Sequence, residues 1–350
     1  MIKRAGILFV GLYLSGGAVA HHSAYAHFDN TDVVDITGEL TPVEWQNPHI
    51  RFVVRSLDEN GEEIEWLVQE RAATLLIRKG VIQDMFRVGD PIRIAGFRGR
   101  RSPTGIFATN ILLADGREVF DESFAEQRWT ENLAGTTKSS IQAAVTQELP
   151  TESRSIFRVW STIAPVFDGS GRNLDRVLWN DSYPLTANAR ETQARWDPVE
   201  DNPYIHCRNG MPAIMDQIHP MEFREDGGDV LLHLEEQDIV RRIHMPDEPR
   251  RSEQSSPFGY SLGRWDGETL VAATTDIDWP WFDQAGVPQS AALELMERFT
   301  PSADGRVLSY ALTATDPAVF TEPVTLQRTW IWVPGEEIEP YNCSREGDSL

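Results

Sequence analysis

Short apolar runs separated by Asp-Gly and Asn-Gly pairs most limit how this chain can fold. Such pairs favour the positive-φ backbone of tight hairpin turns. In the second half, Asp226-Gly227-Gly228-Asp229, Asp266-Gly267 and Asp304-Gly305 each lie between two apolar runs, at a spacing typical of antiparallel strands. We therefore predict a mainly β protein in which residues 156–345 form an antiparallel, lipocalin-like β-barrel or a sandwich. Expected strands are 221–224, 230–234, 239–245, 258–265, 269–275, 295–299, 307–315 and 324–333, with one helix at 185–196.

Residues 21–120 carry five apolar runs and one helical segment between the third and the fourth run. The helical segment is Ala72–Arg78, which ends next to Gly80, a typical helix C-cap. This order of elements is that of a five-stranded oligonucleotide/oligosaccharide-binding (OB) barrel. An open five-stranded sheet is the alternative. The expected strands are 33–43, 50–57, 63–68, 92–97 and 105–113.

Two further segments frame these units. Residues 1–20 combine Lys3 and Arg4, a short apolar stretch and the small residues Ala18 and Ala20, the pattern of a cleaved signal peptide. The protein is then periplasmic or secreted; an uncleaved anchor is the alternative. No later apolar run is long enough to span a bilayer. Residues 121–155 are rich in polar side chains, so we interpret them as a linker, or as a short amphipathic helix.

Charge and missing motifs exclude several function classes. The formal net charge of −22 repels a phosphate backbone, so a nucleic-acid partner is not expected. The chain has no Gly-rich dinucleotide or phosphate loop, so no nucleotide cofactor is expected, and no His-Glu-x-x-His or Cys-x-x-Cys zinc motif. There are two cysteines, Cys207 and Cys343. In an oxidising compartment we expect them to form a disulfide; two buried thiols are the alternative.

Histidines after the expected cleavage site form the candidate metal centre. Cleavage after Ala20 would expose His21, whose α-amine and ring nitrogen can bind one ion. A further imidazole, from His49 at the start of the second strand, would complete a nitrogen site suited to copper, with zinc as the alternative. His22 and His27 compete for that third position. The competing interpretation is a solvated chain end that binds metal only adventitiously.

A second candidate site lies in the C-terminal unit, as a small-ligand pocket. Its expected residues are Tyr260, Arg264, Trp265, Asp276 and Glu297. Trp279, Trp281 and Asp283, in a loop after Asp276, suit sugar or cation contacts or cover the core. Two functions stay open: an exported binding protein, or a cofactor-independent hydrolase, isomerase or lyase that uses carboxylates. An assembly module without a small ligand is a third interpretation.

Several motifs resemble one known family. They are His21-His22-Ser23-Ala24-Tyr25, Asn47-Pro48-His49, Gly259 to Trp265, and Glu297-Arg298-Phe299. The first two are similar to exported bacterial proteins catalogued only as a domain of unknown function, and the last two to the β-rich region that often follows that domain. The resemblance implies export, a mature start that bears histidine and a β-rich fold, and it brings no established reaction.

Overall fold

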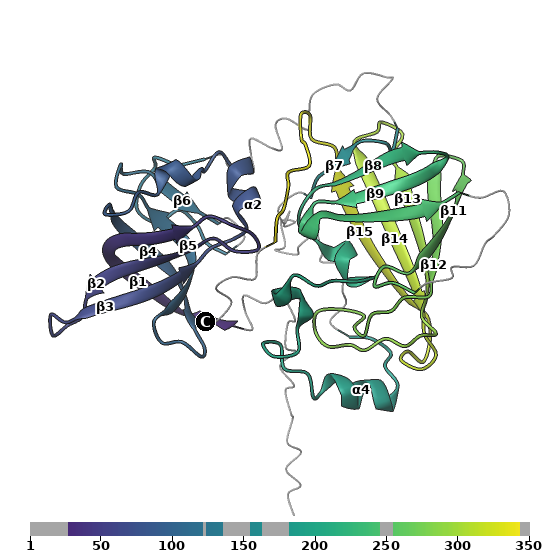
Figure 1. Ribbon diagram of the computed structural model, residues 1–350, viewed down its shortest axis with the longest axis horizontal. Helices are drawn as coiled ribbons and strands as arrows, with labels where there is room; N and C mark the ends of the chain where they lie inside the picture. The colour runs from purple at the N-terminus through teal and green to yellow at the C-terminus, as the bar shows by residue number, and fades with distance from the viewer. Residues whose placement is uncertain (1–26, 122–123, 136–154, 163–181, 246–254, 344–350) are drawn as a thin grey trace, which may run out of the picture.

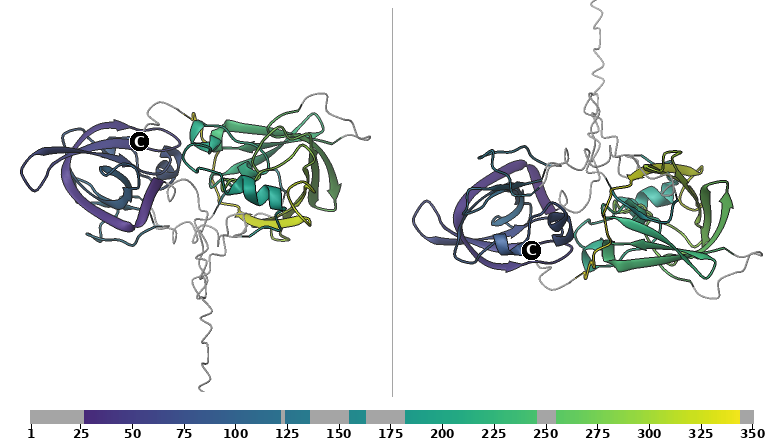
Figure 2. Two further views of the ribbon diagram at one scale, coloured as in Figure 1. Left: turned by 90° about the horizontal axis from the view of Figure 1, so that it is seen from below. Right: turned by 90° about the horizontal axis from the view of Figure 1, so that it is seen from above.

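The structure, a computed structural model, describes residues 27–121, 124–135, 155–162, 182–245 and 255–343. The described chain is mainly β, as the sequence predicts, and forms two sheets. Figures 1 and 2 show two barrel-like units side by side, with the segment that follows the last strand passing between them. His21, His22 and the expected cleavage site lie outside the described residues.

The first unit has the strand order of an OB barrel. Each of β1 to β5 pairs with its neighbours in the order β3-β2-β1-β4-β5, and a parallel pairing between β3 and β5 closes the ring. Closure removes the two open edges that a flat five-stranded sheet would expose. Its elements are β1 (Phe28–Glu44), β2 (Arg51–Leu57), β3 (Glu63–Gln69), α2 (Ala73–Arg78), η1 (Gln83–Met85), β4 (Pro91–Gly99), β5 (Gly105–Leu112) and β6 (Glu118–Phe120).

Two glycines allow neighbouring strands to approach closely in this barrel. A Cβ at Gly38 of β1 would lie 2.2 Å from the carbonyl oxygen of Arg55, and one at Gly96 of β4 would lie 2.1 Å from that of Phe107. Any side chain there would push the strands apart. Both glycines therefore permit the tight curvature that closes a small barrel.

The first unit continues past residue 120, where the sequence analysis placed the start of the linker. Glu118 is fully buried, and its carboxylate accepts hydrogen bonds from the backbone N–H groups of Arg128 at 2.9 Å and Trp129 at 2.8 Å. Ala134 belongs to the core of the first barrel. A buried carboxylate needs such donors, so the polar chain after β6 is held against the barrel. The described part of 121–155 up to residue 135 thus packs on the first unit.

The second unit is one nearly closed, barrel-like sheet of nine strands, which settles the choice between barrel and sandwich. Strands follow chain order, all antiparallel except for the parallel pair β10–β11. Ser161, next to β7, pairs with Ile331 of β15 and joins the two edges. The strands are β7 (Val159–Trp160), β8 (Met221–Asp226), β9 (Asp229–Leu234), β10 (Ile239–His244), β11 (Tyr260–Asp266), β12 (Thr269–Thr275), β13 (Glu294–Pro301), β14 (Val307–Thr315) and β15 (Val324–Ile331).

Short helical segments accompany the second barrel, and a disulfide ties two of its segments together. Residues 185–196, predicted as a helix, contain α4 (Ala187–Gln193), and the 3₁₀ segments are η3 (Pro203–His206), η4 (Ala213–Asp216) and η5 (Glu236–Asp238). Cys207, just after η3, forms a disulfide with Cys343. Inside the barrel, alternate residues of β13 point inward, and the rings of Phe299, Tyr310 and Trp330 pack against one another in tilted and edge-on contacts that fill the core.

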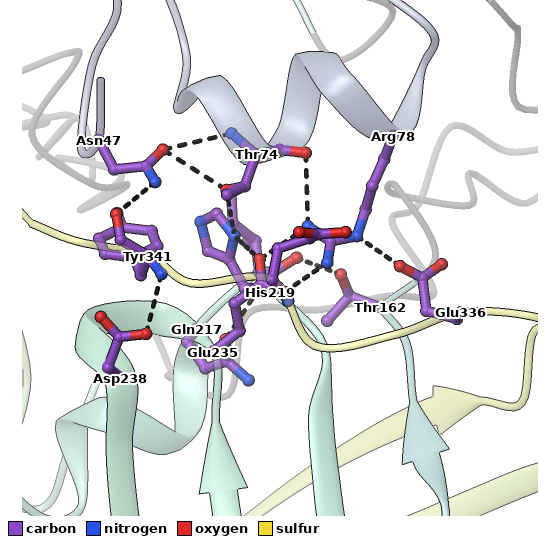
Figure 3. Close-up of polar contacts among 12 residues, drawn as sticks. Asn47, Thr74, Arg78, Thr162, Gln217, His219, Glu235, Asp238, Glu336 and Tyr341 are labelled. Carbon is purple, nitrogen blue, oxygen red and sulfur yellow. Dashed lines mark hydrogen bonds and ion pairs between the residues drawn. The ribbon is translucent and has the colours of Figure 1, made fainter. Parts of the chain in front are cut away.

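A buried polar junction holds the two barrels together (Figure 3). Arg78, at the end of α2, forms a two-point ion pair with the fully buried Glu235 of the second barrel. The same carboxylate contacts Nδ1 of His219 at 3.1 Å. The side-chain amide of Asn47 donates to the backbone oxygen of Tyr341 at 2.6 Å. Because these groups are buried and paired across the boundary, separating the barrels would leave charges unpaired.

Candidate functional site

His49 lies at the entrance to β2, and its ring is held in one orientation. Its Nδ1 atom is 3.0 Å from the backbone oxygen of Glu70. A carbonyl oxygen only accepts hydrogen bonds, so Nδ1 carries the proton and Nε2 keeps its lone pair. Burial lowers the pKa of His49 to about 4, so the ring is neutral at physiological pH. An oriented, neutral imidazole with one nitrogen tied to a carbonyl is the usual form of a metal-binding histidine.

A chain of aromatic rings connects His49 to His27, the first described residue. The His49 ring meets Phe107 edge-on at 6.4 Å, Phe107 lies 5.6 Å from Phe28, and Phe28 lies 6.4 Å from His27. A charge on His27 also lowers the pKa of His49, in addition to the larger effect of burial. The two histidines therefore occupy the same end of the first barrel. In the described ranges, no three His, Cys, Asp or Glu side chains come together as a metal-binding group.

Ionisable groups are buried beside His49. Burial, reinforced by the charge of Asp121, raises the pKa of Glu70 to about 7, and both carboxylates are almost fully buried. Arg71 forms an ion pair with Asp121, and its guanidinium lies 5.1 Å from the centre of the Phe124 ring. Glu70 and Arg71 are the residues joined by the peptide whose carbonyl orients His49, so their buried contacts help to hold the ring in position.

The interior of the second barrel contains a fully buried ion pair. Arg241 of β10 contacts both carboxylate oxygens of Glu297, at 3.1 and 2.7 Å. Thr274 and Tyr310 donate to the same carboxylate at 3.1 and 2.9 Å. The negative charge of Glu297 raises the pKa of Arg241 although burial opposes it. Every oxygen of Glu297 is thus engaged by protein groups, and the carboxylate is not presented to solvent.

The five predicted pocket residues do not form one site. Glu297 aligns across the sheet with Ala272 and Gly263, whereas Arg264 aligns with Val271 and Arg298, so Glu297 and Arg264 lie on opposite faces. Arg264 and Asp276 are exposed. Trp265 is 43% exposed, and Tyr260 stacks on His244 at 4.8 Å. The groups that contact Glu297 are Arg241, Thr274 and Tyr310, none of which the sequence analysis named.

Residues of the loop that the sequence analysis predicted after Asp276 line part of a small depression. Trp279, Trp281 and Asp283 line it together with Tyr204 and Arg208. The Trp-rich loop was visible in the sequence. Its other wall, next to Cys207, lies some seventy residues earlier in the chain and carries no motif.

Comparison with known proteins finds a match only in the first part of the chain. Residues 11–107 match the Family of unknown function (DUF6152). The match includes the Asn47-Pro48-His49 motif and ends within β5, so the second barrel lies beyond it. No curated protein matches the chain. Among the residues that the structure describes, no helix combines the length and the apolar character needed to cross a bilayer.

Proposed function

We propose that this protein is an exported copper-binding protein in which His49 and His21 bind the ion. In this proposal, residues 1–20 are a signal peptide, and cleavage in the periplasm or during secretion makes His21 the amino terminus. The α-amine and imidazole of His21 then supply two nitrogens, and Nε2 of His49 supplies the third. Three nitrogens in a tetragonal arrangement suit copper, whereas zinc prefers a tetrahedral set.

The fixed orientation and neutral charge of the His49 ring are the single observation on which this proposal rests. Its Nδ1–H donates to the Glu70 carbonyl, and its pKa is lowered to about 4 by burial. A metal ion therefore does not compete with a proton for Nε2 at neutral pH. The planes of the His49 and Phe107 rings meet at 84°, an edge-on contact that further fixes the orientation of the imidazole.

The position of His27 supports the participation of the chain start. His27 precedes β1 directly and lies at the same barrel end as His49. His21 lies six positions before His27, and six residues of extended chain reach up to about 20 Å. His21 is thus within reach of His49 from this attachment point. His22 and His27 are the competing donors. We further propose that the second barrel is the β-rich region that accompanies this family.

The test is copper binding by the processed full chain. Protein purified from the periplasm should have an intact mass that begins at His21, hold one Cu(II) and give the electron paramagnetic resonance spectrum of nitrogen ligation. Zinc should bind more weakly in direct competition. His49→Gln should lower copper affinity at least about tenfold, about 1.4 kcal/mol. His206→Gln, on an exposed histidine of the second barrel, is the matched control and should leave affinity unchanged.

A second variant tests the amino terminus separately. A chain that keeps one extra residue before His21 has no α-amine on the histidine, so its affinity should fall by a similar factor. Equal copper binding by the extended and native starts would refute the role of His21. Equal binding by His49→Gln and wild type would refute the role of His49.

A further inference from the structure

The segment after β15 lies between the two barrels and is fastened to the second one. We call residues 339–343 the strap (Figures 1 and 3). Cys343, at its end, is joined by the disulfide to Cys207. The carboxylate of Asp238, in η5, accepts the backbone N–H of Tyr341 at 2.8 Å and that of the next residue at 2.9 Å. These contacts fix the backbone of Tyr341 relative to the second barrel.

The carbonyl oxygen of Tyr341 contacts the first barrel. Tyr341 is 2% exposed, and its ring meets the ring of His219 edge-on at 5.0 Å. The side-chain amide of Asn47, a residue that is 4% exposed, donates to the Tyr341 oxygen at 2.6 Å, as Figure 3 shows. A buried hydrogen bond is costly to break, because neither group then finds water. The strap and Asn47 are therefore held together.

The other half of the Asn47 amide binds the start of α2. Its Oδ1 atom accepts the backbone N–H of Thr74 at 3.3 Å. The residue that precedes α2, Ala72, has no side-chain oxygen, so Asn47 supplies the acceptor that the start of a helix needs. The donor and the acceptor of one buried amide thus bind different barrels. An amide that is held at both ends keeps one orientation.

Asn47 lies two positions before His49, with Pro48 between them. The proline ring fixes one backbone torsion of this short connection, so a shift of Asn47 is passed on to His49. On the other side of His49, the N–H of Ile50 donates to the backbone oxygen of Arg71 at 3.1 Å. The histidine is therefore held from two sides, and only the contact through Asn47 depends on the second barrel.

We propose that the strap positions His49 for metal binding through Asn47, which makes the second barrel a part of the copper centre. As far as it concerns copper, this inference rests on the proposed function. A ligand that is already held in its bound position loses little freedom when the ion arrives, and this raises the affinity. Asn47 and Asp238 are then positioning residues, because they act on the orientation of His49 and do not bind the ion.

Copper affinity of the processed full chain is the first measurement. Asn47→Ala should lower it about tenfold, the usual cost of losing a group that orients a metal ligand. Asp238→Asn removes one acceptor from the strap and should lower the affinity about threefold. The double variant should bind copper like Asn47→Ala, because the strap acts through Asn47. A loss of about thirtyfold in the double variant would show independent effects and overturn the proposal.

Glu336→Gln is the matched control. It makes the same change from carboxyl to amide in the segment just before the strap, where Glu336 pairs with Arg78 of the first barrel. Its copper affinity should equal that of wild type. If Glu336→Gln lowered the affinity as much as Asp238→Asn, general loosening between the barrels would be the cause, and the role of Asn47 would be refuted.

Folding of the variants is checked by circular dichroism. Asp238 is exposed, and asparagine tolerates its positive φ of 54°, so Asp238→Asn should fold like wild type. The test therefore stands even if Asn47→Ala does not fold. Unchanged copper affinity in a folded Asp238→Asn would overturn the proposal.

Hydrogen exchange of the metal-free chain tests the positioning without copper. Mass spectrometry of peptides that cover residues 47–54 should show faster exchange in Asn47→Ala and Asp238→Asn than in wild type and Glu336→Gln. Unchanged exchange in both variants would refute the positioning, even if wild type binds copper. Faster exchange in a chain whose wild type binds no copper would refute the copper centre and support the hold of the strap on His49.

Discussion

Removal of the Glu297 carboxylate should destabilise the second barrel more than any exposed charge change. Glu297 is fully buried and receives two contacts from Arg241 and one each from Thr274 and Tyr310. Glu297→Ala would leave the guanidinium of Arg241, 2% exposed, without its counter-charge. Breaking a buried pair on one side costs about 3–5 kcal/mol, so we expect a loss of about 4 kcal/mol in the free energy of unfolding.

Two controls separate the buried charge from simple loss of side-chain contacts. The double variant Arg241→Met with Glu297→Leu removes both charges and keeps apolar volume, so it should lose far less than the single variant. Asp266→Asn breaks an exposed pair with Arg298 in the same sheet, with both side chains roughly half exposed. Its cost should be small, because solvent screens an exposed ion pair.

Urea titrations of the oxidised full chain, followed by tryptophan fluorescence and far-ultraviolet circular dichroism, would measure these losses. Linear extrapolation gives the free energy of unfolding, and an unchanged slope shows that the same surface is exposed. If Glu297→Ala cost no more than Asp266→Asn, the pair would contribute nothing despite its burial. Equal losses in the single and the double variant would show that packing, rather than an unpaired charge, sets the cost.

Three further predictions concern the carboxyl group of Glu70, the imidazole of His49 and the disulfide. The pKa of Glu70 is raised to about 7 from an ordinary 4.5, so stability should fall as pH rises from about 4.5 to about 7. Glu70→Gln should therefore raise the urea midpoint at pH 8 and leave it unchanged at pH 4. The pKa of His49 is lowered to about 4 from 6.5, so on acidification the unfolded chain binds the proton of this histidine first. Stability should therefore fall between pH 6.5 and 4, by at most about 3.4 kcal/mol, and His49→Gln should flatten that part of the profile of urea midpoint against pH. Cys207 and Cys343 are 136 residues apart in the sequence. Reduction of their disulfide by dithiothreitol should lower the free energy of unfolding, measured by urea denaturation, by up to about 5 kcal/mol. An unchanged urea midpoint would refute the chain-entropy estimate.

Local pattern predicted the elements of this fold well. The Asp266-Gly267 pair was expected to form a turn, and Gly267 has φ +62° between β11 and β12. The segment 72–78 was expected to be helical and contains α2, which ends before Gly80 with φ +81°. These features depend on residues within a few positions of one another, so the sequence alone contains the information.

The candidate sites were predicted less completely. His49 could be singled out because an Asn-Pro-His turn opens a strand, but its bond to Glu70 depends on a residue 21 positions away. The pocket set around Arg264 and Glu297 was chosen from neighbouring strands without knowledge of their faces. Cross-strand register then placed the two side chains on opposite sides of the sheet.

By itself, the sequence determined that the chain is mainly β, where its turns fall, and that an OB-ordered unit precedes a hairpin-rich one. Only the tertiary structure decided that the second unit closes through Ser161 and Ile331, and that Arg241 neutralises Glu297. The physical reason is the separation along the sequence of the residues that interact. Turns and strands follow from steric preferences of adjacent residues, whereas ring closure and charge pairing depend on which distant strands become neighbours.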